Sequence, residues 1–225
     1  MTWLRKLFNI GAAISIVILT INFELMASSS IAGSKNDLID AALHCDMTAV
    51  KGSLARGADV NARGKDGMTP LMAASGNGCT EVARALLARG ANVNARDQNG
   101  LSPLIWTSCN GYTEIAQALI ARGAEINVKD KDGVTPLIGA SSRGSTEIVQ
   151  ALIAKGAEIN VRDRDGMTPL ICASVNGQAE VVQVLLAKGA DFNVKDNNAD
   201  TALMLASRHG YHQVVELLRK AGAKE

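Results

Sequence analysis

The sequence predicts an all-α solenoid of about six helix-turn-helix units with projecting turns. A TPL-like tripeptide recurs every 33 residues, and all four prolines of the chain fall in that one column. Three glycine columns keep the same step and hold fifteen of the 21 glycines. The stretches between these columns suit helices of about eight to ten residues, which are marginal alone. Each unit must therefore bury its apolar face against the next unit, which produces a solenoid.

The first 32 residues are predicted to be a signal peptide. Arg5 and Lys6 precede an apolar stretch at 10–21, and a segment rich in small residues follows, which is the order typical of a secretory signal. Twelve helical residues span only about 18 Å of a hydrocarbon core about 30 Å thick. We expect cleavage after Ala27 or Ala32, and a periplasmic or secreted chain. The alternative is an uncleaved membrane anchor with the repeats on the non-cytoplasmic side, because the two basic residues favour the cytoplasm.

The remaining chain divides into units by the same columns. We expect a degenerate N-terminal cap repeat at 33–65, four full repeats at 66–198, and a C-terminal cap repeat at 199–225. The cap repeats depart from the pattern, because Asp37 and Ala202 stand in the proline column. Such atypical ends are expected of a stacked array.

Within a full repeat each column has a predicted structural role. Thr69 can N-cap a first helix, with Pro70 at N1, where its missing donor costs nothing. This helix stops near Gly78. A second helix begins near Thr80 and ends at Gly90, which suits the left-handed position after a helix.

An asparagine recurs in the segment that connects successive repeats. An amide can both donate and accept hydrogen bonds. We therefore expect each of these side chains, buried or half-buried, to bridge the backbones of adjacent turns. The column consists of Asn61, Asn94, Asn127, Asn160 and Asn193.

The motifs DGMTPLMAAS and GNGCTEVARALLARGANVN, with near copies over about residues 34–225, resemble the ankyrin-repeat family. The whole chain is similar to bacterial exported ankyrin proteins. The family often has TPLH, with a histidine that is usually a structural hydrogen-bonding residue. Its place is taken here by Met72, Ile105, Ile138, Ile171 and Met204. We expect this departure to alter local packing without threatening the fold.

The resemblance implies a non-enzymatic module that binds another protein through its turn tips and the concave face of its first helices. We name the corresponding positions the partner strip. At the tips the strip contains Lys65, Met68, Gln98, Leu101, Lys131, Val134, Arg164 and Met167. Along the helix edge it contains Cys109, Asn110, Ser142, Arg143, Val175, Asn176, Arg208 and His209.

The partner strip includes an apolar row at the tips, with basic residues beside it. One interpretation is an adaptable protein-binding surface. The alternative is that the row only covers the adjacent turns. The row consists of Met68, Leu101, Val134 and Met167.

Composition and motifs indicate no catalytic, cofactor or metal site. The 23 basic and 22 acidic residues nearly cancel, so the chain lacks the broad positive field that nucleic-acid binding usually requires. There is no HExxH, GxSxG or phosphate-cradling glycine loop. His209 and His212 are three apart, but no third zinc ligand has a compelling position nearby.

The four cysteines are expected to be free, partly buried thiols. Helices of adjacent repeats lie roughly 8–10 Å apart, whereas a disulfide needs Cα atoms closer than about 7 Å. The best exception is the pair Cys45 and Cys79, because the geometry of a cap repeat can deviate.

Trp106 has two interpretations. Its equivalents in the neighbouring repeats are the small residues Ala73 and Gly139. A large ring between two small residues favours interlocking packing in the core or along a groove. The alternative is direct contact with a partner.

Overall fold

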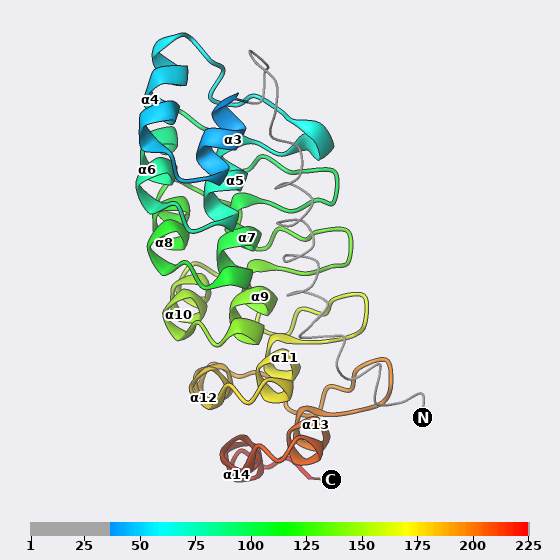
Figure 1. Cartoon of the computed structure of the whole chain (residues 1–225). Coiled ribbons are helices and arrows are strands. Elements are labelled where there is room, and N and C mark those ends of the chain that lie inside the picture. Colours follow the sequence, from blue (N-terminus) through cyan, green and yellow to red (C-terminus); the bar gives the residue numbers. More distant parts are fainter. Residues whose placement is uncertain (1–36, 225) are drawn as a thin grey trace. The chain divides into compact units, whose positions relative to one another are not determined.

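The computed structural model describes residues 37–224, and within this range the chain is a stack of six helical hairpins (Figure 1). No β-strand occurs among these residues, apart from one isolated bridge between Lys195 and Thr201. The first helices of the hairpins are α3 (Asp37–Leu43), α5 (Pro70–Gly76), α7 (Pro103–Asn110), α9 (Pro136–Arg143), α11 (Pro169–Val175) and α13 (Ala202–Arg208). The second helices are α4 (Met47–Ala55), α6 (Thr80–Ala88), α8 (Thr113–Ala121), α10 (Thr146–Ala154), α12 (Ala179–Ala187) and α14 (His212–Lys220).

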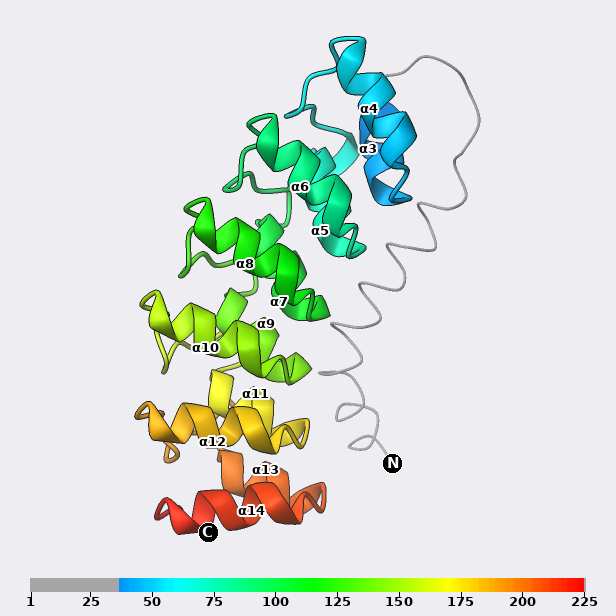
Figure 2. The same cartoon turned by 90° about the vertical axis from the view of Figure 1, so that its left-hand side faces the viewer.

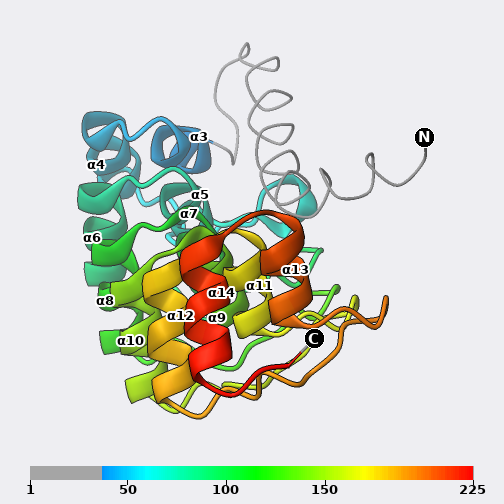
Figure 3. The same ribbon diagram turned by 90° about the horizontal axis from the view of Figure 1, so that it is seen from below.

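The hairpins stack in sequence order and form two layers. The first helices make an inner layer and the second helices an outer layer, while the connecting turns project on the side away from the outer helices (Figure 1). Figure 2 shows the outer helices one above another, and Figure 3 shows the same stack end-on. One turn contains a short 3-10 helix, η1 (Lys65–Gly67). This arrangement confirms the all-α solenoid that the 33-residue period predicts.

The predicted signal peptide lies outside the described residues. Of the helices that the structure describes, none has both the length and the apolar character needed to cross a membrane.

The inner helices begin as the sequence predicts. The Thr69 side chain accepts a hydrogen bond from the Met72 backbone N–H at 3.3 Å, and Pro70 occupies the first turn. Ser102 caps α7 in the same way through Ile105, at 3.2 Å. The same geometry recurs at Thr135, Thr168 and Thr201.

The helix ends also follow the glycine columns. Gly78 and Gly90 have φ values of +71° and +81°, the left-handed region that a residue with a Cβ rarely adopts. The predicted helix boundaries of a full repeat are therefore confirmed.

The core runs through the inner layer and the inward face of the outer layer. Four of the five residues that replace the family's histidine are 0–1% exposed: Met72, Ile105, Ile138 and Ile171. The missing hydrogen-bonding group is thus replaced by apolar packing, and the fold is unchanged, as expected. Each outer helix from α6 to α12 buries a central leucine together with apolar neighbours.

Four of the five residues in the asparagine column, Asn193 excepted, bond to the next repeat as predicted. Asn127 donates from Nδ2 to the Gly156 carbonyl at 3.0 Å and accepts at Oδ1 from the Glu158 N–H at 2.9 Å. Asn94 makes the same pair of bonds one repeat earlier, and Asn61 does so two repeats earlier. The expected burial is wrong for most of the column, because all of these residues except Asn94 are exposed.

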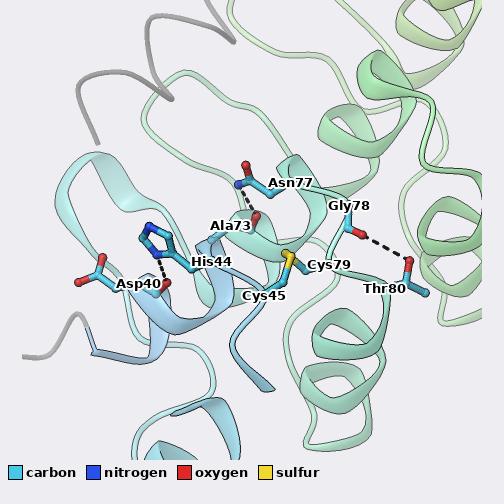
Figure 4. The surroundings of a disulfide bond; sticks show 8 residues. All are labelled: Asp40, His44, Cys45, Ala73, Asn77, Gly78, Cys79 and Thr80. Carbon is cyan, nitrogen blue, oxygen red and sulfur yellow. Dashed lines mark hydrogen bonds between the residues drawn. A yellow bond between two sulfur atoms is a disulfide. The ribbon is translucent and has the colours of Figure 1, made fainter. Parts of the chain in front are cut away.

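The expectation of four free thiols is wrong, because Cys45 and Cys79 form a disulfide with a Cα–Cα distance of 5.1 Å (Figure 4). The helix spacing on which the expectation rested does not apply at the hairpin turns. There, a residue in a left-handed conformation lies against the residue 34 positions later in the next repeat. Cys45 has a φ of 57° and occupies the column of Gly78. Gly78 itself lies so close to Tyr112 that a Cβ would be 2.6 Å from Cε1 of the ring.

The other two cysteines are free, as expected. Cys172 is buried and Cys109 half-buried. Desolvation raises the pKa of the Cys109 thiol to about 12, and it raises the pKa of Cys172 further still. Both side chains are therefore protonated and unreactive at neutral pH.

Candidate partner-binding surface

Each central turn tip is organised by a half-buried aspartate. Asp97 Oδ1 accepts from the backbone N–H groups of Asn99 and Leu101, at 2.8 and 2.9 Å. Asp130, Asp163 and Asp196 bind their own turns in the same pattern. This aspartate column was not predicted from the sequence, although an aspartate whose side chain can hydrogen-bond the backbone two residues later is a known turn signal.

Burial determines the protonation behaviour of these aspartates. Desolvation raises the pKa of Asp97, Asp130 and Asp163 above the ordinary value of 3.8. The hydrogen bonds from backbone N–H groups lower the pKa and offset only part of this effect. These carboxylates therefore stabilise their own turns and contribute little to the exposed surface.

Adjacent tips are joined into one edge by backbone hydrogen bonds. The Gln98 N–H donates to the Asp66 carbonyl at 2.8 Å, and the Lys131 N–H donates to the Asn99 carbonyl at 2.9 Å. The bonds from Arg164 to Asp132 and from Asn197 to Asp165 continue the series. The Arg96 guanidinium also donates to the Lys129 carbonyl of the following tip. The tips therefore hold a fixed spacing along the stack.

The tip part of the partner strip is polar rather than apolar. Lys65, Gln98, Lys131 and Arg164 are exposed. The apolar row is only partly accessible: Met68, Leu101 and Val134 are half-buried, and Met167 is 1% exposed. Met167 therefore covers its own turn and cannot contribute contact area.

The helix-edge part of the partner strip contains both exposed and half-buried residues. Arg143, Arg208 and His209 are exposed. The half-buried members are Cys109, Asn110, Ser142, Val175 and Asn176. Two of the amides are held by their own helices, since the Nδ2 groups of Asn110 and Asn176 donate to carbonyls four residues earlier, at 3.0 and 2.8 Å.

In the last repeat, Arg208 forms an ion pair that was not predicted from the sequence. Arg208 binds both carboxylate oxygens of Asp200, at 2.8 and 2.9 Å, and this hydrogen bonding raises the pKa of the arginine. The neighbouring His209 stacks on Tyr211, with ring centroids 5.8 Å apart. Only eight residues separate Asp200 and Arg208, but the pairing depends on the path of the tip, which periodicity does not predict.

Trp106 packs inside the stack. It is 6% exposed, and its ring lies against Gly76 of the preceding repeat, where an added Cβ would be 3.3 Å from Cε3. Its Nε1 is buried and has no hydrogen-bond partner among the described residues. The packing interpretation is confirmed, although the small residue beneath the ring is Gly76 rather than its column equivalents Ala73 and Gly139.

The described residues offer no obvious centre for metal chemistry. Between 37 and 224, no three His, Cys, Asp or Glu side chains gather in a way that could hold a metal ion. His209 and His212 lie at the end of α13 and the start of α14.

Comparison with known proteins agrees with the architecture. The family model for ankyrin repeats (3 copies) matches residues 38–130 and 137–225, which together make up most of the chain. The comparison with curated proteins finds no match. Ankyrin repeats are generally protein–protein interaction modules and typically lack enzymatic activity. The stacked hairpins, their capped inner helices and this match together show that the chain belongs to the ankyrin-repeat family.

Proposed function

We propose that the chain is exported and acts as a non-enzymatic protein-interaction module. The observation that carries this proposal is the continuous edge of hydrogen-bonded tips, in which one exposed column changes between repeats, as at Lys65, Gln98 and Arg164. The packing columns, in contrast, are nearly invariant along the stack. A rigid edge with variable side chains suits recognition of another protein, because little conformational entropy is lost on binding.

Two features support export. The first 32 residues have the basic, apolar and small-residue order of a signal peptide. The Cys45–Cys79 disulfide joins the first two repeats, and Cys45 is exposed. Disulfides form and persist in oxidising compartments, such as the periplasm or the cell exterior, and are rare where thiols are kept reduced.

The proposed contact surface is the partner strip without Met167. Its exposed members Lys65, Lys131, Arg164 and Arg143 would make the first contacts with a partner. The half-buried Met68, Leu101 and Val134 contribute limited apolar area between them. The mechanism is scaffolding, shielding or inhibition of the bound protein.

Cell fractionation with capture tests the proposal. The mature chain, with its disulfide intact, should be found in the exported fraction and should retain a protein partner under gentle conditions. N-terminal sequencing should then begin after Ala27 or Ala32. A chain found only in the cytosol contradicts export. An exported chain that retains no protein contradicts the interaction role.

A second candidate is a membrane-tethered adaptor that keeps its N-terminal segment. This candidate is favoured by the imperfect cleavage positions, since cleavage after Ala27 places Leu25 where a small residue is preferred. The same sequencing experiment separates the two candidates. An intact Met1 on membrane-bound protein supports tethering, and a processed N-terminus excludes it.

A further inference from the structure

We propose that the partner is bound through an acidic polypeptide segment, held along the exposed cations of the tips. This inference rests on the proposed function and specifies the chemistry of the partner. We use "tip segments" for residues 63–68, 96–101, 129–134, 162–167 and 195–200.

Apolar contact cannot dominate recognition by this surface. Among residues 37–224, the one large hydrophobic side chain classed as exposed is Tyr211, at 36%. It lies in the last repeat and stacks on His209. An interface without exposed apolar anchors depends on complementary charges and hydrogen bonds.

The accessible charges of the tip segments are mainly positive. One column is basic in all five tips and exposed throughout: Arg63, Arg96, Lys129, Arg162 and Lys195. A second column adds Lys65, Lys131 and Arg164, which are also exposed. The exposed carboxylates of the same segments are only Asp66, Asp132 and Asp165.

The other tip carboxylates are occupied inside the structure. Asp97, Asp130 and Asp163 are half-buried and bind backbone N–H groups of their own turns. Asp196 is 8% exposed and is used in the same way, while Asp200 binds Arg208. Eight exposed cations and three exposed carboxylates therefore face a partner at the tips, although the formal charges of the segments cancel and Arg164 already binds Asp132.

The outer helices carry both acidic and basic residues. A glutamate lies in the first turn of the four outer helices α6, α8, α10 and α12, and all four are exposed: Glu81, Glu114, Glu147 and Glu180. Arg84 binds Glu81 and Glu114, at 3.1 and 3.0 Å. The outer helices and the tips lie on opposite sides of the stack (Figure 1). Exposed cations, among them Arg89, Lys155 and Lys188, lie at the other ends of these helices, so the outer side carries both signs of charge.

The pattern of tip charges favours a polypeptide over a nucleic acid. Exposed carboxylates stand between the cations at Asp66, Asp132 and Asp165, and they would repel a uniformly charged phosphate backbone. The second and fifth tips present amides, including Gln98 and Asn197. A polypeptide can place acidic residues opposite lysines and polar residues opposite these amides.

Four lysines provide the clearest test of the proposal. Several arginines already serve the structure, since Arg63 and Arg96 donate to carbonyls of the following tip and Arg164 binds Asp132. In contrast, four tip lysine side chains make no hydrogen bond or ion pair within the described part of the chain. They are Lys65, Lys129, Lys131 and Lys195, and their ammonium groups are available to a ligand.

The experiment compares two charge-matched variants of the full chain with the disulfide intact. The tip variant changes these four lysines to glutamine. The control variant makes the same change at four exposed lysines outside the tips: Lys51, Lys155, Lys188 and Lys220. Three fluorescent probes are titrated at low and at physiological salt: a (Glu-Gly-Ser)6 peptide, its lysine counterpart and a short DNA duplex.

The expected result is binding of the acidic peptide by the wild-type chain and the control variant, with affinity falling as salt rises. The tip variant should bind about tenfold more weakly, since four exposed ion pairs are lost. Absence of acidic-peptide binding by the wild type, or equal loss in the two variants, overturns the proposal. Tighter binding of the duplex than of the peptide also overturns it in favour of a nucleic acid.

These outcomes are separable from failure of the proposed function. A captured protein partner that binds the tip and control variants equally preserves the interaction role and removes the acidic-segment proposal. Binding of the acidic peptide by wild type together with loss in the tip variant supports the proposal, whichever compartment contains the chain. Circular dichroism of both variants confirms that the folded state is retained.

Discussion

The first repeat and the central repeats share one turn contact but make it in different ways. In the central repeats, a left-handed glycine lies against the residue 34 positions later, as Gly78 does against Tyr112 and Gly111 against Ser145. At the N-terminal end, Cys45 occupies the glycine position and is bonded covalently to Cys79. The same backbone geometry therefore supports a packed contact in one region and a disulfide in the other.

The difference corresponds to how well the outer helices are packed. α4 buries only Val50 and Ser53, whereas α6 buries Val82, Ala83, Leu86 and Leu87. Ser53 stands in the column that holds leucine in every later repeat. The comparison teaches that an end repeat with few core residues can be held by a bond that does not depend on apolar burial.

The largest effect is expected from replacing the disulfide by the pair found in the central repeats. The double variant Cys45→Gly/Cys79→Ser recreates the Gly111–Ser145 combination at the N-terminal end. Cross-linking across 34 residues contributes about 3–4 kcal/mol in the chain-entropy account. We expect a loss of about 3 kcal/mol, since glycine relieves the left-handed backbone. Urea titration followed by circular dichroism measures it. An unchanged transition would show that packing alone holds the first repeat.

The second prediction compares the same core position in a central repeat and in the first repeat. Leu119 is 0% exposed in α8, and Leu119→Ala should cost about 3 kcal/mol through lost burial and the cavity left behind. Ser53→Ala, in the same column of α4, should cost less than about 1 kcal/mol, because only a hydrogen bond from Arg56 is lost. Equal costs in urea titrations would contradict the view that the first repeat is thinly packed.

The third effect isolates the turn contact itself. Gly78→Ala should cost about 2 kcal/mol, because the residue has a φ of +71° and its new Cβ would clash with the Tyr112 ring. Gly123→Ala is the matched control, with a φ of +82° and nothing within 4 Å of the added atom. It should cost only about 1 kcal/mol for the backbone. If thermal unfolding shows the same loss in both variants, the ring contact contributes nothing.

The smallest effect is a pH dependence restricted to the later tips. Burial raises the pKa of Asp97, Asp130 and Asp163 in the folded chain, whereas the first tip has Gly64 at this position. The folded state therefore binds more protons than the unfolded state just above the ordinary aspartate pKa of 3.8. Through these groups, the free energy of unfolding rises as pH falls from neutrality through that window.

The triple variant Asp97→Asn/Asp130→Asn/Asp163→Asn removes this contribution and keeps an oxygen that can accept the turn hydrogen bonds. Urea titrations at neutral pH and at about pH 4.5 should show a smaller stabilisation on acidification in the variant than in the wild type. A larger stabilisation in the variant would reverse the assigned sign.

The fold was predictable because its determinants repeat in the sequence. Thr69, Pro70 and Gly90 act within a few residues of their own helices, so their columns predict helix starts and ends. The hydrogen bonds of Asn127 to the next repeat were also predictable, since an amide that recurs at the same position of every turn can bond the backbone of the following turn.

The site was less predictable, because it depends on offsets between columns. The 33-residue step aligns equivalent residues, but contacts between turns join positions 34 apart, so the spacing of equivalent helices did not predict the Cys45–Cys79 disulfide. Burial within a tip also varies without a change in residue class, since Met68 is half-buried and Met167 is buried. The inward orientation of Asp97 was likewise not evident from composition, which does not distinguish buried carboxylates from exposed ones.

Site-specific photo-crosslinking tests the central functional claim most directly. A photo-reactive amino acid is placed at Lys131, in the exposed centre of the tips, or at Lys155, which follows α10 outside the partner strip. The full-length chain is then irradiated in its native compartment. The account predicts covalent protein adducts from position 131 and none from position 155. Adducts that form equally at both positions, or only at position 155, would contradict it.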